Sequence, residues 1–153
     1  GGQIEEFEGD INNIISKREV PETDKKIKDY LKYRCPLNQM TVMFRKDKVI
    51  EAGGYLDWFC NEDYYLWIRM TLKDNVFHNL NRTLVKVRVD TKTFKRRGGW
   101  KYFISEYNIQ SLMRKNRIIK FHTFTVNVII RFIIQIIIPN KIRKILFLKL
   151  FRS

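Results

Sequence analysis

The sequence predicts an α/β fold that is followed by a helical C-terminal extension. Up to residue 99, segments with helical spacing alternate with short β-prone segments, whereas the residues after it are helical or apolar. The chain has 153 residues, the size of one domain, and 44% of them are hydrophobic, which is enough to form a core. We therefore expect an α/β part over residues 1–99 and a basic, apolar, helical extension over residues 100–153.

The first part of the chain predicts a connector and then a helix. Gly1–Pro21 is acidic and irregular, so we interpret it as a connector with room for one short strand or helical turn. Thr23–Tyr33 begins with a residue type suited to an N-cap, and Pro36 ends the element, because the residue before a proline avoids the α region. Its apolar residues recur at helical spacing: Ile27, Tyr30 and Leu31.

The next segment predicts a strand, a short helix and a glycine turn. Met40–Phe44 is short and β-prone, so we expect a strand. Lys46–Ala52 is long enough for one or two helical turns. Gly53 and Gly54 stop it, because glycine readily adopts the positive φ of a helix C-cap.

A longer helix is predicted over Glu62–Leu72, with Asn61 as its N-cap. Four residues share one face of it at spacings of three and four: Asp63, Leu66, Trp67 and Met70. Since three of them are apolar, we expect this face to point inward. Asp63 would then be a carboxylate at the start of a helix and on its inward face.

Two strands, a loop and a helix are predicted next. Val76–Leu80 and Thr83–Val89 are β-prone, and Lys95–Gly99 is a basic loop that ends in glycine. Trp100–Arg114 returns to helical spacing. The residues that carry this spacing are Phe103, Ile104 and Tyr107.

The most apolar run is Phe121–Ile138, which Pro139 ends and the basic segment Asn140–Phe151 follows. Polar residues interrupt the run, and a membrane span needs about 20 apolar residues, so we do not expect a span. Its isoleucines nevertheless exceed one helical face. Two interpretations stay open: packing in the protein core, or contact with an anionic membrane surface that attracts the basic residues.

Charge and cysteine content limit the class of partner. The net charge is +14, and no Asp or Glu follows Glu106, which favours anionic partners such as acidic lipid, nucleic acid or a phosphorylated substrate. Cys35 and Cys60 lack CxxC spacing, and no secretion signal is visible. We therefore expect reduced thiols in a cytoplasmic protein at the periphery of the membrane. The two histidines form no Cys/His cluster, so a zinc site is not expected.

Glu62 and Asp63 are the candidate chemical groups. The helix dipole stabilises ionised carboxylates in a first helical turn, and an ionised carboxylate can act as a general base. An acidic pair directly after Asn61 is also an ordinary signal for the start of a helix. The residues alone leave both interpretations open.

An ordered set of motifs resembles bacterial glycosyltransferases of family 2. The motifs are RxPxNxMTVMF from Arg34 to Phe44, GGY from Gly53 to Tyr55, EDYYLWxRM from Glu62 to Met70, and RRGG from Arg96 to Gly99. The resemblance covers most of residues 2–99 in the right order. It implies the GT-A fold, an α/β sandwich with a mostly parallel sheet.

The resemblance also implies a reaction. Asp63 would be the base that deprotonates an acceptor hydroxyl, with Glu62 in support, and the hydroxyl would attack and invert the anomeric carbon of a sugar on a nucleotide-sugar donor. The acceptor would be a saccharide, lipid-linked in polysaccharide biosynthesis. Residues expected to bind acceptor or donor are Asn38, Trp58, Arg96, Arg97, Gly98 and Gly99. A divalent metal, Mg²⁺ or Mn²⁺, is implied for the complete enzyme, with no metal ligand in this chain.

Two of these binding segments also have a plainer interpretation. Trp58 and Phe59 are either a platform for a sugar or aromatic residues of the core. The loop from Arg96 to Gly99 either wraps a diphosphate, since guanidinium groups match phosphate oxygens, or is a solvated basic loop.

The chain departs from the family at Gln39, where many relatives carry a histidine that could move a proton, and it contains no Asp-x-Asp. It also begins Gly1-Gly2 without Met. We therefore expect a fragment that lacks the nucleotide-binding half and is inactive alone. The rival hypothesis is a non-catalytic basic module that binds anionic membrane or nucleic acid, although no specific nucleic-acid motif is present.

Overall fold

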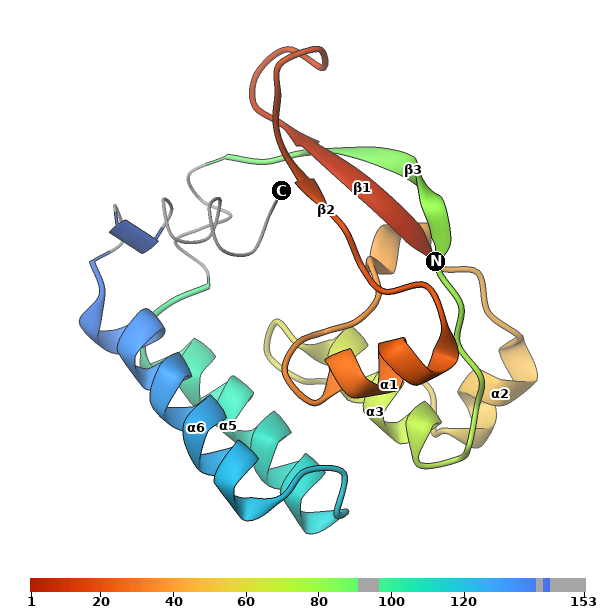
Figure 1. Ribbon diagram of the computed structural model, residues 1–153, viewed down its shortest axis with the longest axis vertical. Coiled ribbons are helices and arrows are strands. Elements are labelled where there is room, and N and C mark those ends of the chain that lie inside the picture. The colour runs from red at the N-terminus through yellow and green to blue at the C-terminus, as the bar shows by residue number, and fades with distance from the viewer. Residues whose placement is uncertain (91–96, 140–141, 144–153) are drawn as a thin grey trace.

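A three-stranded sheet lies at one end of the molecule, and the helices lie beyond it (Figure 1). The computed structural model describes residues 1–90, 97–139 and 142–143. Strand β1 (Gly2–Phe7) is central, with β2 (Ile14–Arg18) antiparallel on one side and β3 (Leu80–Arg88) parallel on the other. This mixed sheet and the helices between β2 and β3 confirm the α/β class.

The interpretation of Gly1–Pro21 as an irregular connector is wrong, because this segment forms the hairpin of β1 and β2. The acidic residues of this segment interrupt the hydrophobic pattern that would predict a strand. Glu6 is only 5% exposed, and its carboxylate accepts a 2.7 Å hydrogen bond from the Ser16 hydroxyl across the hairpin. Ile4 and Phe7 are buried on the same strand. A partnered carboxylate is therefore tolerated in this central strand, although the hydrophobic pattern disfavours a strand there.

The strand predicted over Met40–Phe44 is wrong, and a short 3₁₀ helix (Gln39–Thr41) occupies part of the segment. The Thr41 hydroxyl holds this geometry. It donates to the carbonyl of Asn38 (2.7 Å) and accepts from the amide of Gly2 (2.9 Å). Side-chain bonding to the backbone outweighs β propensity here.

The strand predicted over Val76–Leu80 is wrong except for its last residue, whereas Thr83–Val89 forms most of β3 as predicted. The reason is Asn79, whose side chain is fully buried. Its Nδ2 donates to the carbonyls of Pro21 (2.7 Å) and Pro36 (3.1 Å). The backbone before β3 is therefore held by an asparagine between two loops and not by a neighbouring strand.

The glycine turn after helix α2 (Lys46–Glu51) is confirmed. Gly53 and Gly54 have φ of +87° and +66°, and the Gly54 amide donates to a carbonyl of α2 at 2.8 Å, as in a helix C-cap. Arg69 of helix α3 (Glu62–Thr71) donates to the Gly54 carbonyl at 2.6 Å. Arg69 thus fixes the glycine turn against α3, the next helix in the chain.

Helix α3 runs through the centre of the core. Leu66, Trp67 and Ile68 are at most 1% exposed, so the helix is buried on more than the one predicted face. Helix α1 (Asp24–Leu31) forms where predicted and adds its buried apolar residues to the same core. The core also includes three residues beyond residue 99: Ile109, Met113 and Ile119. The two parts predicted from the sequence therefore share one core.

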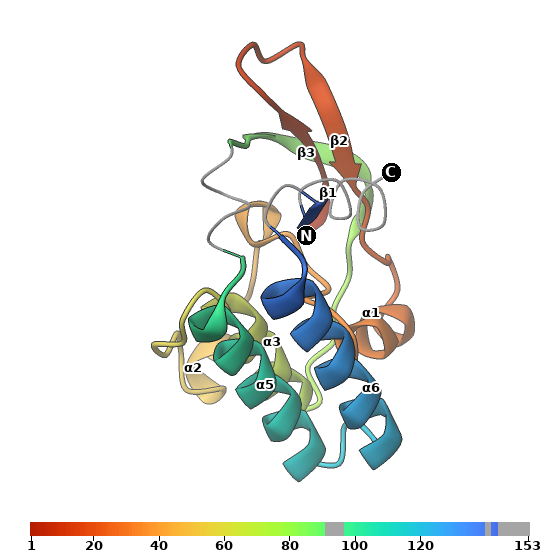
Figure 2. The same ribbon diagram turned by 90° about the vertical axis from the view of Figure 1, so that its left-hand side faces the viewer.

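Helices α5 (Trp100–Lys115) and α6 (Phe121–Phe132) lie side by side as a hairpin next to this core (Figure 2). A π-helical turn (Ile133–Ile137) continues α6. The helical character predicted for the extension is confirmed, although most of Asn140–Phe151 lies outside the described residues. Polar residues of both helices are buried or nearly buried between them. We call these residues the polar seam: Glu106, Gln110, Asn127 and Arg131.

Ion pairing and hydrogen bonds hold the polar seam together. Glu106 pairs with Arg131, and Asn127 Nδ2 donates to Gln110 Oε1 at 2.9 Å. Arg131 also donates to the carbonyl of Tyr33 at 2.6 Å. The seam therefore fixes α6 both to α5 and to the segment after α1.

With their polar residues inward, α6 and the π-helical turn that continues it place several aliphatic residues outward. Five of these, which we call the apolar face, are between 42% and 60% exposed: Val126, Ile129, Ile130, Ile133 and Ile137. Among the described residues, the apolar face does not belong to the core. Within the described ranges, no helix is long and apolar enough to cross a membrane.

We expect the substitution Arg131→Met to lower the free energy of unfolding by about 3–5 kcal/mol, because it leaves the Glu106 carboxylate buried and unpaired. The double variant Glu106→Met/Arg131→Met should recover most of this loss, since it removes both charges. Urea denaturation measures both. The control is Lys48→Met, whose ammonium pairs with Glu51 on the surface of α2 and should change stability by about 1 kcal/mol or less. Equal losses in the single and double variants would contradict this account.

Candidate active site

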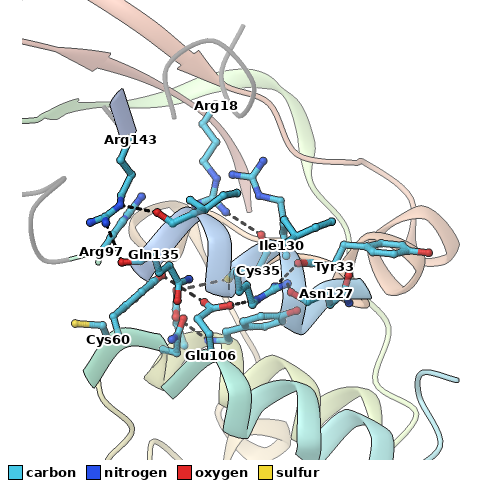
Figure 3. A pocket seen from close by; sticks show the side chains of 17 residues that line it. Arg18, Tyr33, Cys35, Cys60, Arg97, Glu106, Asn127, Ile130, Gln135 and Arg143 are labelled. Atoms are coloured by element: carbon cyan, nitrogen blue, oxygen red, sulfur yellow. Dashed lines mark hydrogen bonds and ion pairs between the residues drawn. The ribbon is translucent and has the colours of Figure 1, made fainter. Parts of the chain in front are cut away.

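A cavity of about 340 Å³ lies where the start of α3, the end of β2 and the α5–α6 hairpin meet (Figure 3). It is the size of a small ligand site. Asp63 and Arg97, two residues predicted from the sequence, both line it. Arg96, predicted beside them, lies outside the described residues. The hairpin supplies a large part of the wall, so the extension belongs to the cavity and not to a separate module.

Asp63 is held by the start of α3. The amide of Tyr64 donates to Asp63 Oδ1 at 2.7 Å, so the carboxylate accepts a backbone hydrogen bond of the first helical turn. Asn61 stands at the N-cap position, but the prediction that it caps the helix is wrong, because its side chain makes no cap hydrogen bond. Its amide donates instead to Ser105 Oγ of α5 at 3.0 Å. Glu62 is exposed and does not line the cavity.

Cys35 is the second group on the Asp63 carboxylate. Its Sγ lies 3.7 Å from Asp63 Oδ2. Burial, and then the charge of Asp63, raise the pKa of the Cys35 thiol to about 12. The thiol is therefore protonated at neutral pH, and its one hydrogen has two acceptors within reach, the Leu37 carbonyl at 3.5 Å and the Asp63 carboxylate. Arg18 adjoins this pair, since its Nη2 donates to the Cys35 carbonyl at 2.8 Å.

The groups around Asp63 have opposing effects on the pKa of its carboxyl group. Burial raises the pKa of Asp63 above its ordinary value and is the largest effect. The Tyr64 amide opposes this rise, Glu62 adds to it, and Arg18 and the Cys35 thiol oppose it. The result is a carboxylate that binds a proton more strongly than an exposed aspartate does. This is the direction that a general base requires.

Gly98 makes room for an arginine of the extension, whereas a side chain on Gly99 would meet no neighbouring atom. A Cβ on Gly98 would lie 1.5 Å from Nη1 of Arg143. The Arg143 guanidinium donates to three carbonyls at the end of α6 and its π turn at 2.8–2.9 Å, and the Gly99 amide donates to the carbonyl of Gln135 at 3.0 Å. The space that the missing side chain of Gly98 leaves is thus occupied by Arg143 in this structure. Ligand binding by the two glycines stays a prediction.

Asn38 and Trp58 do not line the cavity. Asn38 is fully buried, and its Nδ2 donates to the carbonyl of Gly2 in β1 at 2.8 Å. Trp58 is partly buried, with its ring centroid 4.3 Å from that of Tyr65 and its Nε1 donating to the carbonyl of Ser105. The structure brings Asp63 and Arg97 together in the cavity. Asn38 and Trp58 instead support the surrounding fold.

Sequence reasoning missed Arg18, Cys35 and Gln135 as residues of the cavity. Arg18 and Cys35 carry no motif of their own, and only the fold brings them to Asp63. Gln135 did have a signal. Together with Asn127 and Arg131 it recurs every four residues in an apolar run, and such a polar stripe indicates an inward helical face.

No three His, Cys, Asp or Glu side chains lie close enough to hold a metal ion in the described part of the chain. The Mg²⁺ or Mn²⁺ that the resemblance implies therefore has no ligand set among these residues.

Comparisons with known proteins give three informative relatives. The chain is 39% identical over 116 residues to an uncharacterized glycosyltransferase of Haemophilus influenzae, which is 71% of this chain and 43% of that protein. It is 32% identical over 149 residues to the UDP-Gal:alpha-D-GlcNAc-diphosphoundecaprenol beta-1,3-galactosyltransferase of Escherichia coli, 97% of this chain and 54% of that protein. It is 37% identical over 95 residues to the amylovoran biosynthesis glycosyltransferase AmsE of Erwinia amylovora, 62% of this chain and 36% of that protein.

No family model matches the chain, and no solved structure matches it. The chain spans 36% to 54% of the length of these three curated relatives. The similarity reaches both the α3 segment and the helical hairpin in the E. coli relative, since it includes nearly the whole chain. The chain is thus similar to part of several bacterial proteins that are named glycosyltransferases, and this supports a role in glycosyl transfer.

Proposed function

We propose that this chain is the acceptor side of an inverting glycosyltransferase of family 2 with a GT-A-like fold, and that Asp63 is its general base. The observation that carries the proposal is the position of the Asp63 carboxylate. It is fixed at a helix start, half-buried, in a cavity that also contains Arg18 and Arg97. Similarity to proteins named glycosyltransferases supplies the reaction class.

In the proposed reaction Asp63 takes the proton of an acceptor hydroxyl as the hydroxyl oxygen attacks the anomeric carbon of the donor sugar. A carbon–oxygen bond forms to the acceptor, and the bond from the anomeric carbon to the nucleoside diphosphate breaks, so the configuration inverts. The diphosphate leaves with the bonding electron pair. Asp63 must therefore be ionised before the reaction and protonated after it.

The substrates proposed for the first assay come from the name of the E. coli relative, which is similar to nearly the whole chain. They are UDP-galactose as the nucleotide-sugar donor and a lipid-linked saccharide, N-acetylglucosamine diphosphoundecaprenol, as the acceptor. The donor, and any Mg²⁺ or Mn²⁺ with it, is proposed to be held mainly by residues outside this chain. We therefore expect the chain alone to bind acceptor and to transfer no sugar.

A lipid-linked acceptor would suit the apolar face, which we propose lies on an anionic membrane surface at the cytoplasmic side. Ile130 belongs both to the apolar face and to the wall of the cavity. The apolar surface therefore continues to the rim of the cavity, where a lipid-linked sugar would enter. The excess of Lys and Arg over Asp and Glu favours the same surface.

The substitution Asp63→Asn in the intact protein should lower kcat/KM by about 10²-fold or more, since general-base catalysis contributes on the order of 10²–10⁴. The melting temperature should not fall. Because the folded-state pKa of Asp63 is raised, its ionised form lowers stability at pH 7, and asparagine removes that penalty. The control is Asp57→Asn, an exposed carboxylate in the preceding loop. Retained transfer in Asp63→Asn would exclude the assignment and leave the rival hypothesis, a non-catalytic basic module.

The dependence of kcat/KM on pH should reflect the ionisation of Asp63. Activity should fall as the pH drops through the raised pKa of Asp63, because protonation removes the base. The substitution Cys35→Ala removes a hydrogen bond to the ionised form, so the acid limb of kcat/KM should move to higher pH. Cys60→Ala is the matched control, since this second thiol lines the same cavity and should leave the limb in place. An acid limb that does not move in Cys35→Ala would contradict the contact.

Membrane contact is tested by flotation with vesicles that contain anionic lipid. Ile129→Asn and Ile133→Asn should each weaken binding about 10-fold, as expected when a buried isoleucine side chain is lost. Val76→Asn is the control, because Val76 is 81% exposed but lies outside the apolar face. Binding should also weaken with added salt. Binding that ignores the two α6 changes would exclude the apolar face as the contact.

A further inference from the structure

Two polar atoms in the wall of the cavity are buried and have no hydrogen-bond partner among the described residues. They are Arg18 Nε and Gln135 Oε1. The Gln135 residue is only 7% exposed. Five other buried polar atoms of the described residues also lack a partner, but none of them belongs to a residue that lines the cavity. Because buried polar atoms are usually paired in folded proteins, a donor and an acceptor left over in one cavity favour a ligand that pairs both.

The charges around the cavity define the ligand further. Five arginines line it, against two carboxylates, Asp63 and Glu106. One of the arginines, Arg131, pairs with Glu106. Because the lining holds more arginines than carboxylates, it favours an anionic group, and a guanidinium Nε–H is a strong donor to phosphate oxygen. Gln135 Oε1 can only accept, so the same ligand must also present a hydroxyl or an N–H.

We propose that Arg18 and Gln135 form a subsite for a sugar 1-phosphate, with Arg18 Nε donating to a phosphate oxygen and a sugar hydroxyl donating to Gln135 Oε1. The inference rests on the proposed function, because it takes the sugar to be the acceptor. Figure 3 shows the arrangement, in which Arg18 comes from the side of β2 and Gln135 from the opposite helical wall.

The contacts of Cys35 link this subsite to the base. Cys35 Sγ contacts the Asp63 carboxylate, and the Cys35 carbonyl accepts from Arg18. Arg18 and Asp63 therefore both contact Cys35, so a phosphate on Arg18 and a hydroxyl on Asp63 would lie on either side of this residue. The cavity volume of about 340 Å³ has room for one sugar and its phosphate. We infer that the attacked hydroxyl and the phosphate belong to the same sugar, so the acceptor is a phosphate-linked monosaccharide and not a long oligosaccharide.

The phosphate could instead belong to the donor, since a nucleotide-sugar offers the same chemistry. The position of Asp63 favours the acceptor, because the base has to contact the hydroxyl that attacks. Isothermal titration of the chain separates the sources with three probes: N-acetylglucosamine 1-phosphate for the acceptor, UDP for the donor, and inorganic pyrophosphate for a free anion. No transfer is needed for this measurement.

We expect N-acetylglucosamine 1-phosphate to bind and neither UDP nor pyrophosphate to displace it at equal concentration. Arg18→Gln should weaken binding roughly 10–100-fold, and Gln135→Met about 10-fold, as expected for single hydrogen bonds with and without charge. Gln135→Met should not lower the melting temperature, because Oε1 has no partner to lose. Arg82→Gln, an exposed arginine of β3 outside the cavity, should bind as the unchanged chain does.

Three results would overturn the subsite. They are unchanged affinity in both Arg18→Gln and Gln135→Met, displacement of the sugar phosphate by UDP, or equal displacement by pyrophosphate. Asp63→Asn separates this inference from the proposed function, since it should abolish transfer in the intact protein and still bind the sugar phosphate. Lost binding in Arg18→Gln together with full transfer in Asp63→Asn would keep the subsite and exclude the base.

Discussion

The arrangement of the cavity depends on the polar seam between α5 and α6. Aromatic residues of the two helices meet, such as Phe103 with Phe132 and Tyr107 with Phe124. The polar residues Glu106, Gln110, Asn127 and Arg131 are buried between the same two helices, while the apolar face is turned outward. Burying such groups is unfavourable unless they are paired, so the seam allows few alternative rotations of α6. The rotation that satisfies the seam is also the one that places Gln135 in the cavity wall.

Local patterns in the sequence were sufficient to predict α1, α2 and α3, and hence Asp63, because helical spacing marks α1 and α3 and a proline or a glycine pair stops α1 and α2. The sheet was not predictable in this way. Strand β1 carries Glu6, which only its partner Ser16 makes tolerable, and Asn79 takes the place of a strand by bonding to two loops. Both arrangements depend on residues distant in sequence, which no local window contains.

The residues of the cavity likewise divide into those that local sequence predicts and those that only the fold brings together. Asp63 and Arg97 come from motifs and could be predicted, whereas Arg18 and Cys35 acquire a role only through the fold. The extension was interpreted as a possible membrane contact because its isoleucines dominate its composition. Its chemistry lies in the minority residues, Asn127, Arg131 and Gln135, whose spacing of four residues sets the inward face.

In the proposed enzyme one helical segment therefore has two roles: its apolar face contacts the membrane, and Gln135 contributes to the cavity wall. The polar seam fixes the rotation of the helix and so couples the two roles. The apolar face and Gln135 lie on different sides of one continuous helical segment, so their relative direction is fixed by the helix itself. If the apolar face lies on a membrane, the orientation of the cavity relative to that membrane follows without a further contact. Ile130, shared by the face and the cavity, then sets the edge at which a lipid-linked sugar phosphate meets Arg18 and Asp63. The buried polar residues of α6 fix the rotation of the helix. In the proposed enzyme this rotation brings the lipid surface and the acceptor site beside the base to the same edge of the molecule.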